Sequence, residues 1–263
     1  MATPPAGGAL GALALIAALS AAPALAAQSA DGEEGLAVFR VRFAGPPNSE
    51  LAGEVLRVLR EAERESRGRL GFGPPGPLTV VLESDAALQE TGLPEWADGL
   101  YDGNIRVPAG GLERPTERLV TVLRHELAHK FIDARTGGNC PAWLQEGLSQ
   151  WLEGDAPNRE DERMARLARE RRLPALLTLE APFVGRADDE VPLAYAASLS
   201  AAAHILRTRG VPGVVRLLES LGAGLPTEEA LPDALGMSYR QLQESWDEHL
   251  ASLSGRAAET AAQ

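Results

Sequence analysis

Apolar and polar residues follow two different periods in the first part of the chain. Residues 38–43 alternate apolar and basic side chains, which predicts a half-buried strand. Residues 51–70 carry leucine, valine and alanine on one stripe and charged residues on the other, which predicts an amphipathic helix. After a loop rich in glycine and proline at 71–77, the apolar run at 78–82 is typical of a buried strand.

The next predicted elements lie at residues 99–108, where Asp102 and Gly103 predict a turn followed by a short strand. Pro108 at the end of that strand favours an edge position in a sheet. Beyond it the spacing of apolar residues is helical. We expect helices at 119–134, at 141–153, at 191–209 and after the capping box of Ser238 and Gln241, with a charged, solvated helical face at 159–172. Strands first and helices afterwards predict an α+β fold with a mixed sheet and a mainly helical C-terminal half.

The N-terminus has the pattern of a secretory signal. A short apolar stretch, Ala9–Leu19, precedes small residues that form an Ala-x-Ala site near Ala27. We therefore expect residues 1–27 to be a signal peptide and the mature chain to be exported, to the periplasm or the extracellular space. The alternative is an uncleaved membrane anchor, although the run is shorter than the roughly 20 apolar residues that a bilayer requires.

Charge and cysteine content exclude several classes of protein. The formal net charge is −12 at pH 7 and no basic stripe is present, so nucleic acid and anionic membrane surfaces are not expected partners. The single cysteine, Cys140, excludes a disulfide within the chain and a zinc site built from several thiolates. The expected domain organisation is a flexible lead-in at 28–35, a first subdomain at 36–154, a helical subdomain at 155–253 and a disordered tail at 254–263.

The sharpest chemical signal is His125-Glu126-Leu127-Ala128-His129. Residues four apart on a helix share a face, so His125 and His129 present both imidazoles to one point and supply half of a tetrahedral metal site. Glu126 lies beside that face, where it can reach a metal-bound water without binding the metal. The surrounding residues are mostly apolar, and buried polar groups are costly unless they are paired or liganded. The alternative is a structural histidine pair with a surface glutamate.

A catalytic metal needs a third protein ligand. Glu146 is the best candidate, because it lies off the buried stripe of the next predicted helix and is followed by Gly147, which would let two helices approach closely. Asp133, one turn beyond His129, and Glu153, at the end of the next helix, are rival third ligands.

His125-Glu126-x-x-His129 followed by Trp143-Leu144-x-Glu146-Gly147 resembles the gluzincin clan of zinc metallopeptidases, and in particular the bacterial peptidase-MA-like domains. The resemblance covers most of residues 36–253. It implies a zincin-like fold, one zinc ion per chain and a peptide or protein substrate. It also implies roles for single residues: His125, His129 and Glu146 as zinc ligands, Glu126 as the general base, and Tyr195 as a donor to the oxyanion.

Some alternatives stay open at this stage. Tyr195 is equally well explained as a core aromatic, and His204 is better explained as an interior histidine than as a catalytic donor. Cys140 is better explained as a cap than as a fourth zinc ligand. The strand Asn104–Val107 could pair with an extended peptide, as the resemblance also suggests. The expected function is an exported zinc metallopeptidase. The rival functions are a non-catalytic binding domain of zincin fold and a zinc hydrolase of a non-peptide substrate.

Overall fold

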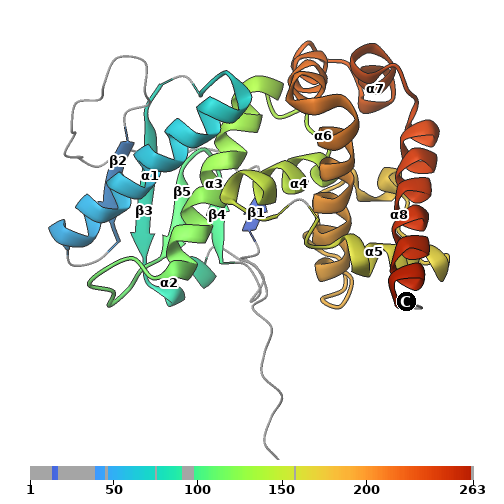
Figure 1. Ribbon diagram of the computed structural model, residues 1–263. Helices are drawn as coiled ribbons and strands as arrows, with labels where there is room; N and C mark the ends of the chain where they lie inside the picture. The colour runs from blue at the N-terminus through green and yellow to red at the C-terminus, as the bar shows by residue number, and fades with distance from the viewer. Residues whose placement is uncertain are drawn as a thin grey trace, which may run out of the picture.

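The computed structural model describes residues 14–16, 39–44, 47–74, 76–90, 98–156 and 158–261, with the backbone alone at 14–16 and 254–261. Figure 1 shows a sheet with its covering helices on one side of the molecule and a group of helices on the other. The expected α+β class, with a mixed sheet first and a mainly helical C-terminal half, is confirmed.

The described strands form a five-stranded sheet in the order β1-β4-β5-β3-β2. Its centre is parallel: β2 (Phe39–Phe43) pairs with β3 (Leu78–Glu83), and β3 pairs with β5 (Ile105–Pro108). The strand β4 (Gly99–Tyr101) is antiparallel to β5, to which the expected turn joins it. The backbone of β1 (Ala14–Ile16) runs parallel to β4 on its outer side.

The expectation that Pro108 marks an edge strand is wrong, because β5 lies between β4 and β3. Pro108 is the last residue of β5, so its missing N–H removes no bond from within the ladder. The next residue continues the pairing, since Ala109 N donates to the Glu83 carbonyl at 2.8 Å. The strand Asn104–Val107 therefore has no free edge for a peptide, and β4 is the strand that lies further out.

Two long helices cover one face of the sheet (Figure 1). The first, α1 (Ser49–Leu70), begins at Asn48, whose side chain accepts hydrogen bonds from the first turn, and ends at Gly71 in a left-handed conformation. The second, α3 (Glu117–Thr136), follows the short helix α2 (Asp85–Gln89) and the strands β4 and β5. These helices and the strands enclose the first core, which includes Leu51, Val55, Leu59, Val80, Ile105, Val107, Leu123, Leu127 and Phe131.

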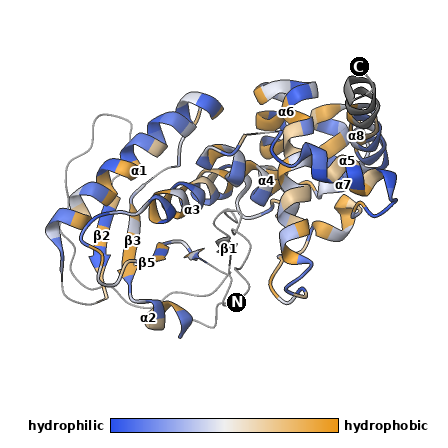
Figure 2. Cartoon of the chain, turned by 60° about the horizontal axis from the view of Figure 1, so that its bottom comes forward, coloured by the Kyte–Doolittle hydropathy of each residue, from blue (hydrophilic) through white to orange (hydrophobic). Residues whose placement is uncertain are grey.

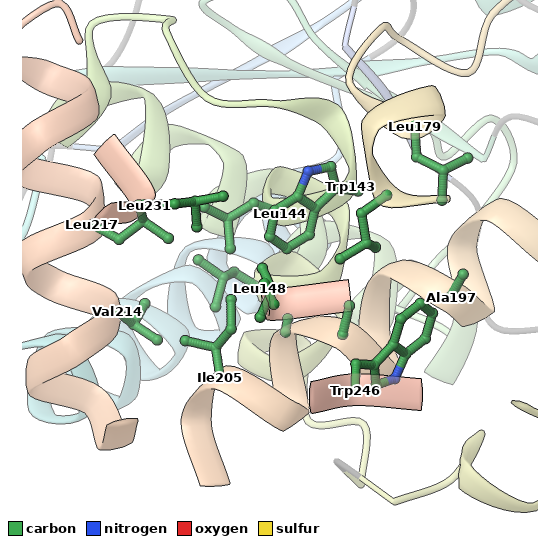
Figure 3. Close-up of a cluster of buried hydrophobic side chains, with 14 of the residues drawn as sticks. Trp143, Leu144, Leu148, Leu179, Ala197, Ile205, Val214, Leu217, Leu231 and Trp246 are labelled. Atoms are coloured by element: carbon green, nitrogen blue, oxygen red, sulfur yellow. The ribbon is translucent and has the colours of Figure 1, made fainter. Parts of the chain in front are cut away.

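The remaining helices build a second core. They are α4 (Ala142–Glu153), α5 (Asp161–Arg169), the short 3-10 helix η1 (Leu176–Leu179), α6 (Val191–Gly222), α7 (Thr227–Leu235) and α8 (Tyr239–Ala261). The long α6 bends at Gly210, whose φ of 65° leaves the helical region. Figure 3 shows Trp143, Leu144 and Leu148 of α4 buried among side chains of the other helices. Because α4 also contacts α3, it joins the two halves.

Hydropathy follows this arrangement. Figure 2 shows long hydrophilic stretches on α1 and α5, whereas α6 is largely hydrophobic where it packs inside the second half. None of the helices in the described part of the chain is long and apolar enough to cross a membrane. Apart from the backbone of β1, the expected signal peptide and the lead-in at 28–35 lie outside the described residues. The backbone of α8 continues through 254–261, where we expected disorder, and alanine, arginine and glutamate there favour a helix.

Candidate metal centre

The helix α3 brings both histidines of the motif to one point in the interior. It begins at Thr116, whose hydroxyl accepts from Leu119 N at 3.2 Å, and it ends at Gly137 in a left-handed conformation. His125, Glu126 and His129 lie midway between these ends, and each has 0% exposure. The two imidazole rings lie edge to face with centroids 4.7 Å apart, as the spacing of one helical turn requires.

The third candidate ligand, the carboxylate of Glu146, comes from α4. Its Oε2 lies 3.2 Å from Nε2 of His125 and 3.7 Å from Nε2 of His129. Metal bonds of about 2 Å in a tetrahedral site place neighbouring ligand atoms about 3.3 Å apart. These three residues are the only group of potential ligands in the described chain whose donor atoms all lie within 4.8 Å of one another. The choice of Glu146 over its two rivals agrees with this geometry.

Several buried polar atoms of the centre have no hydrogen-bond partner. Within the described residues, Nε2 of His129 and both carboxylate oxygens of Glu126 are buried without a hydrogen-bond partner. Such groups are costly in an interior unless a ligand completes them. Two imidazole nitrogens and a carboxylate are donors that Zn²⁺ accepts, so the residues fit a divalent ion of this type.

The second nitrogen of each imidazole ring is also held by α4. Nδ1 of His125 is in close contact with the carboxylate of Glu153, and Nδ1 of His129 lies 3.1 Å from the hydroxyl of Ser149. Glu153 is therefore a partner of a ligand and not a third ligand. Sequence reasoning missed both contacts. The available signal was the spacing of Ser149 and Glu153, three and seven residues after Glu146, which places all three on one helix face.

Burial and mutual charge shift the pKa values of the centre. Burial alone would lower the pKa of His125, but the carboxylates of Glu153 and Glu146 outweigh it and raise the pKa well above its ordinary value. Burial and the charge of His125 lower the pKa of His129. Burial raises the pKa of both Glu126 and Glu146. The site thus gathers two carboxylates and two imidazoles, and a bound cation would favour the ionised carboxylates and the neutral imidazoles.

The strand β4 borders the centre on the side of Glu126. A β-carbon built on Gly99 would lie 2.9 Å from Oε1 of Glu126 and 2.6 Å from a methyl group of Val122. No other residue could bring the β4 backbone this close to α3 without displacing the glutamate. Gly99 therefore lets a strand lie directly beside the side chain expected to act as the base.

Tyr195 lies in α6, the helix that packs on α4. Its ring is buried and packs edge to face on Phe183, with centroids 5.3 Å apart. Burial and the negative charges of Glu146 and Glu126 raise the pKa of its hydroxyl, so these carboxylates lie within electrostatic reach. Gln150 of α4 donates to the Tyr195 carbonyl at 3.0 Å and fixes this part of α6 against the ligand helix.

The other candidates lie outside the ligand group. Asp133 instead forms a hydrogen bond with Tyr101 of β4. His204 is an interior histidine, as expected, with Nε2 2.9 Å from the hydroxyl of Ser245. Cys140 packs against the second core, and burial raises the pKa of its thiol, so the structure gives no support to a reactive thiolate.

Comparison with protein families shows which family this chain belongs to. Residues 79–252 match the sequence model of the Peptidase MA superfamily, a span that contains β4, both ligand helices and most of the helical half. The comparison with curated proteins finds no match. The matched span covers most of the chain and includes His125, Glu126, His129 and Glu146, and the chain therefore belongs to the Peptidase MA superfamily.

Proposed function

We propose that this protein is an exported zinc metallopeptidase of the gluzincin type. The observation that carries the proposal is the convergence of His125, His129 and Glu146 on one buried point, with the unpartnered carboxylate of Glu126 beside it. Membership of the Peptidase MA superfamily supports hydrolysis of peptide bonds over other reactions. The expected signal at residues 1–27 supports export.

The residues have complementary roles. A zinc ion held by the three ligands would activate a water molecule and polarise the substrate carbonyl. Glu126 would accept a proton from the water at its carboxylate and deliver a proton to the leaving amine. Burial raises the pKa of Glu126, which makes its carboxylate a stronger base near neutral pH. Tyr195, from α6, would donate its hydroxyl proton in a hydrogen bond to the developing oxyanion.

The test compares residues 28–263 with the variant Glu126→Gln, which keeps the shape of the side chain and removes its basicity. Both proteins are loaded with zinc, their metal content is measured, and each is incubated with a mixed peptide library that is read by mass spectrometry. We expect cleavage by the wild type, no cleavage by the variant, and one zinc ion per chain in both.

Two other outcomes would contradict the proposal in different ways. Bound zinc without cleavage by the wild type would favour the rival functions, a non-catalytic binding domain or a zinc hydrolase of a non-peptide substrate. An ester substrate cleaved under the same conditions would identify the second of these. A wild type that binds no zinc would overturn the metal centre itself.

A further inference from the structure

We infer that Glu153 is a positioning residue for the metal ligand His125, and that a single face of α4 orients both histidine ligands. This inference rests on the proposed zinc centre and concerns how tightly the ion is held. Glu146, Ser149 and Glu153 follow one another at intervals of three and four residues, so they share one face of α4. That face lies against His125 and His129 of α3.

Glu153 is a buried carboxylate that is paired with a histidine of the centre. Its side chain is 3% exposed, and His125 is its only ion-pair partner among the described residues. A buried carboxylate without an arginine or lysine partner is costly to a fold. Glu153 is also the last residue of α4, immediately before Gly154. The last residue of α4 thus places a carboxylate beside Nδ1 of His125.

The contact decides which nitrogen of His125 faces the ion. The Glu153 carboxylate accepts a hydrogen bond from Nδ1 of His125, which leaves Nε2 as the nitrogen that binds a metal ion. Nε2 is the atom that faces Glu146, at 3.2 Å from Oε2. The negative charge behind the ring also makes Nε2 a stronger donor to a metal.

Ser149 performs the same task for His129 more weakly. Its hydroxyl is neutral and lies 3.1 Å from Nδ1 of His129, so it fixes the ring without adding charge. Neutral hydrogen bonds are weaker than those to an ionised group. The two histidines are therefore supported unequally, and Glu153 contributes more to the metal affinity than Ser149 does.

The experiment measures zinc affinity in competition with a chromophoric chelator, together with the visible absorption spectrum of the cobalt(II)-substituted protein. Removal of a partner of this kind weakens metal binding by about 10- to 100-fold. We expect Glu153→Ala, which removes charge and acceptor, to show the larger loss in this range. Glu153→Gln keeps an acceptor oxygen and should lose less, and Ser149→Ala should lose least, under about 10-fold. The cobalt spectrum should change in the Glu153 variants because His125 is no longer held in one orientation.

The matched control is Glu83→Gln. Glu83 is also a buried carboxylate, 4% exposed, but its ion-pair partner is Arg106 of β5 and not a histidine of the centre. Its variant should bind zinc like the wild type. The inference is overturned if the Glu153 variants bind zinc as tightly as the wild type, or if they only lower the melting temperature of the zinc-free protein. It is also overturned if the wild type binds no zinc, whereas tight zinc binding without peptide cleavage would contradict the proposed function alone.

Discussion

Gly147 of α4 lies so close to Ser198 of α6 that a β-carbon built on the glycine would be 2.1 Å from the serine carbonyl oxygen. The same β-carbon would lie 2.8 Å from the side chain of Ala202. The neighbour is backbone in a buried helix, so it cannot move aside as a flexible side chain would. The residue next to the candidate ligand Glu146 therefore sets the distance between α4 and α6.

We predict that Gly147→Ala destabilises the protein by about 3 kcal/mol, the upper end of the usual cost of overpacking. It should also weaken zinc binding, because the displaced α4 carries Glu146 and both orienting side chains. Thermal denaturation and chelator competition measure the two effects. The control is Gly53→Ala in the exposed part of α1, where a β-carbon meets nothing within 4 Å. That variant should be as stable as the wild type or more stable, because alanine favours helix over glycine. Equal behaviour of the two variants would contradict the prediction.

Tyr195→Phe tests the oxyanion donor. Loss of one such donor lowers kcat by about 100- to 1,000-fold. We expect that loss with little change in KM, and with zinc affinity unchanged because Tyr195 is not a ligand. Tyr239→Phe provides the comparison, since the Tyr239 hydroxyl is hydrogen-bonded to Glu180 and Trp143, outside the ligand group. A kcat that falls equally in both variants would indicate a structural role for Tyr195.

Removal of zinc should lower the melting temperature. Zinc at 1,000 times its dissociation constant stabilises the folded state by about 4 kcal/mol. For a chain of this size that corresponds to a shift of about 10 °C, to be seen by calorimetry before and after dialysis against a chelator. The variant His129→Ala should show no zinc-dependent shift. If zinc removal leaves the melting temperature of the wild type unchanged, the assignment of the buried ligands is contradicted.

His204 should make the protein less stable in acid. Burial, Arg207 and His249 lower the pKa of His204 to about 4, whereas a histidine in the unfolded chain titrates near 6.5. As pH falls below about 6.5 the unfolded state binds a proton that the folded state does not, so stability declines until about pH 4. The loss is at most about 3 kcal/mol, because each pKa unit corresponds to about 1.4 kcal/mol and solvent screens the charge of the exposed arginine.

The variant His204→Gln isolates this contribution, since glutamine can still bond Ser245 and does not titrate. Denaturant unfolding of zinc-loaded protein at a series of pH values should show a shallower decline between pH 6.5 and 4 in the variant. At pH 8 the slopes with pH should agree. The same decline in both proteins would mean that His204 does not titrate differently on unfolding.

Several features of the candidate centre were predictable because they depend on neighbours along one helix. The spacing of His125 and His129 brings both rings to one side of α3 whatever the rest of the fold does. The boundaries of α1 were also predictable, because Asn48 and Gly71 terminate it through local hydrogen bonds and backbone conformation.

Other features depended on contacts between segments distant in the sequence. The pattern around Pro108 was compatible with an edge strand, and only the pairing of β5 with both β3 and β4 placed it inside the sheet. Gly147 was expected to permit a close helix approach, but the sequence could not show that the partner is Ser198 of α6. Helix periodicity identifies a face and does not say which other element will cover it.

By itself, the sequence determined that two histidines and a glutamate share a buried helix and that strands precede helices, and it predicted Glu146 as the third ligand. The tertiary structure alone decided that Ser149 and Glu153 hold the outer nitrogens of those histidines, and that Tyr195 lies within electrostatic reach of Glu146 and Glu126. Ligand spacing within one helix is a local property of the backbone. The orientation of a ligand depends on which helix packs against it. That packing depends on contacts between the two halves of the molecule, which α4 joins.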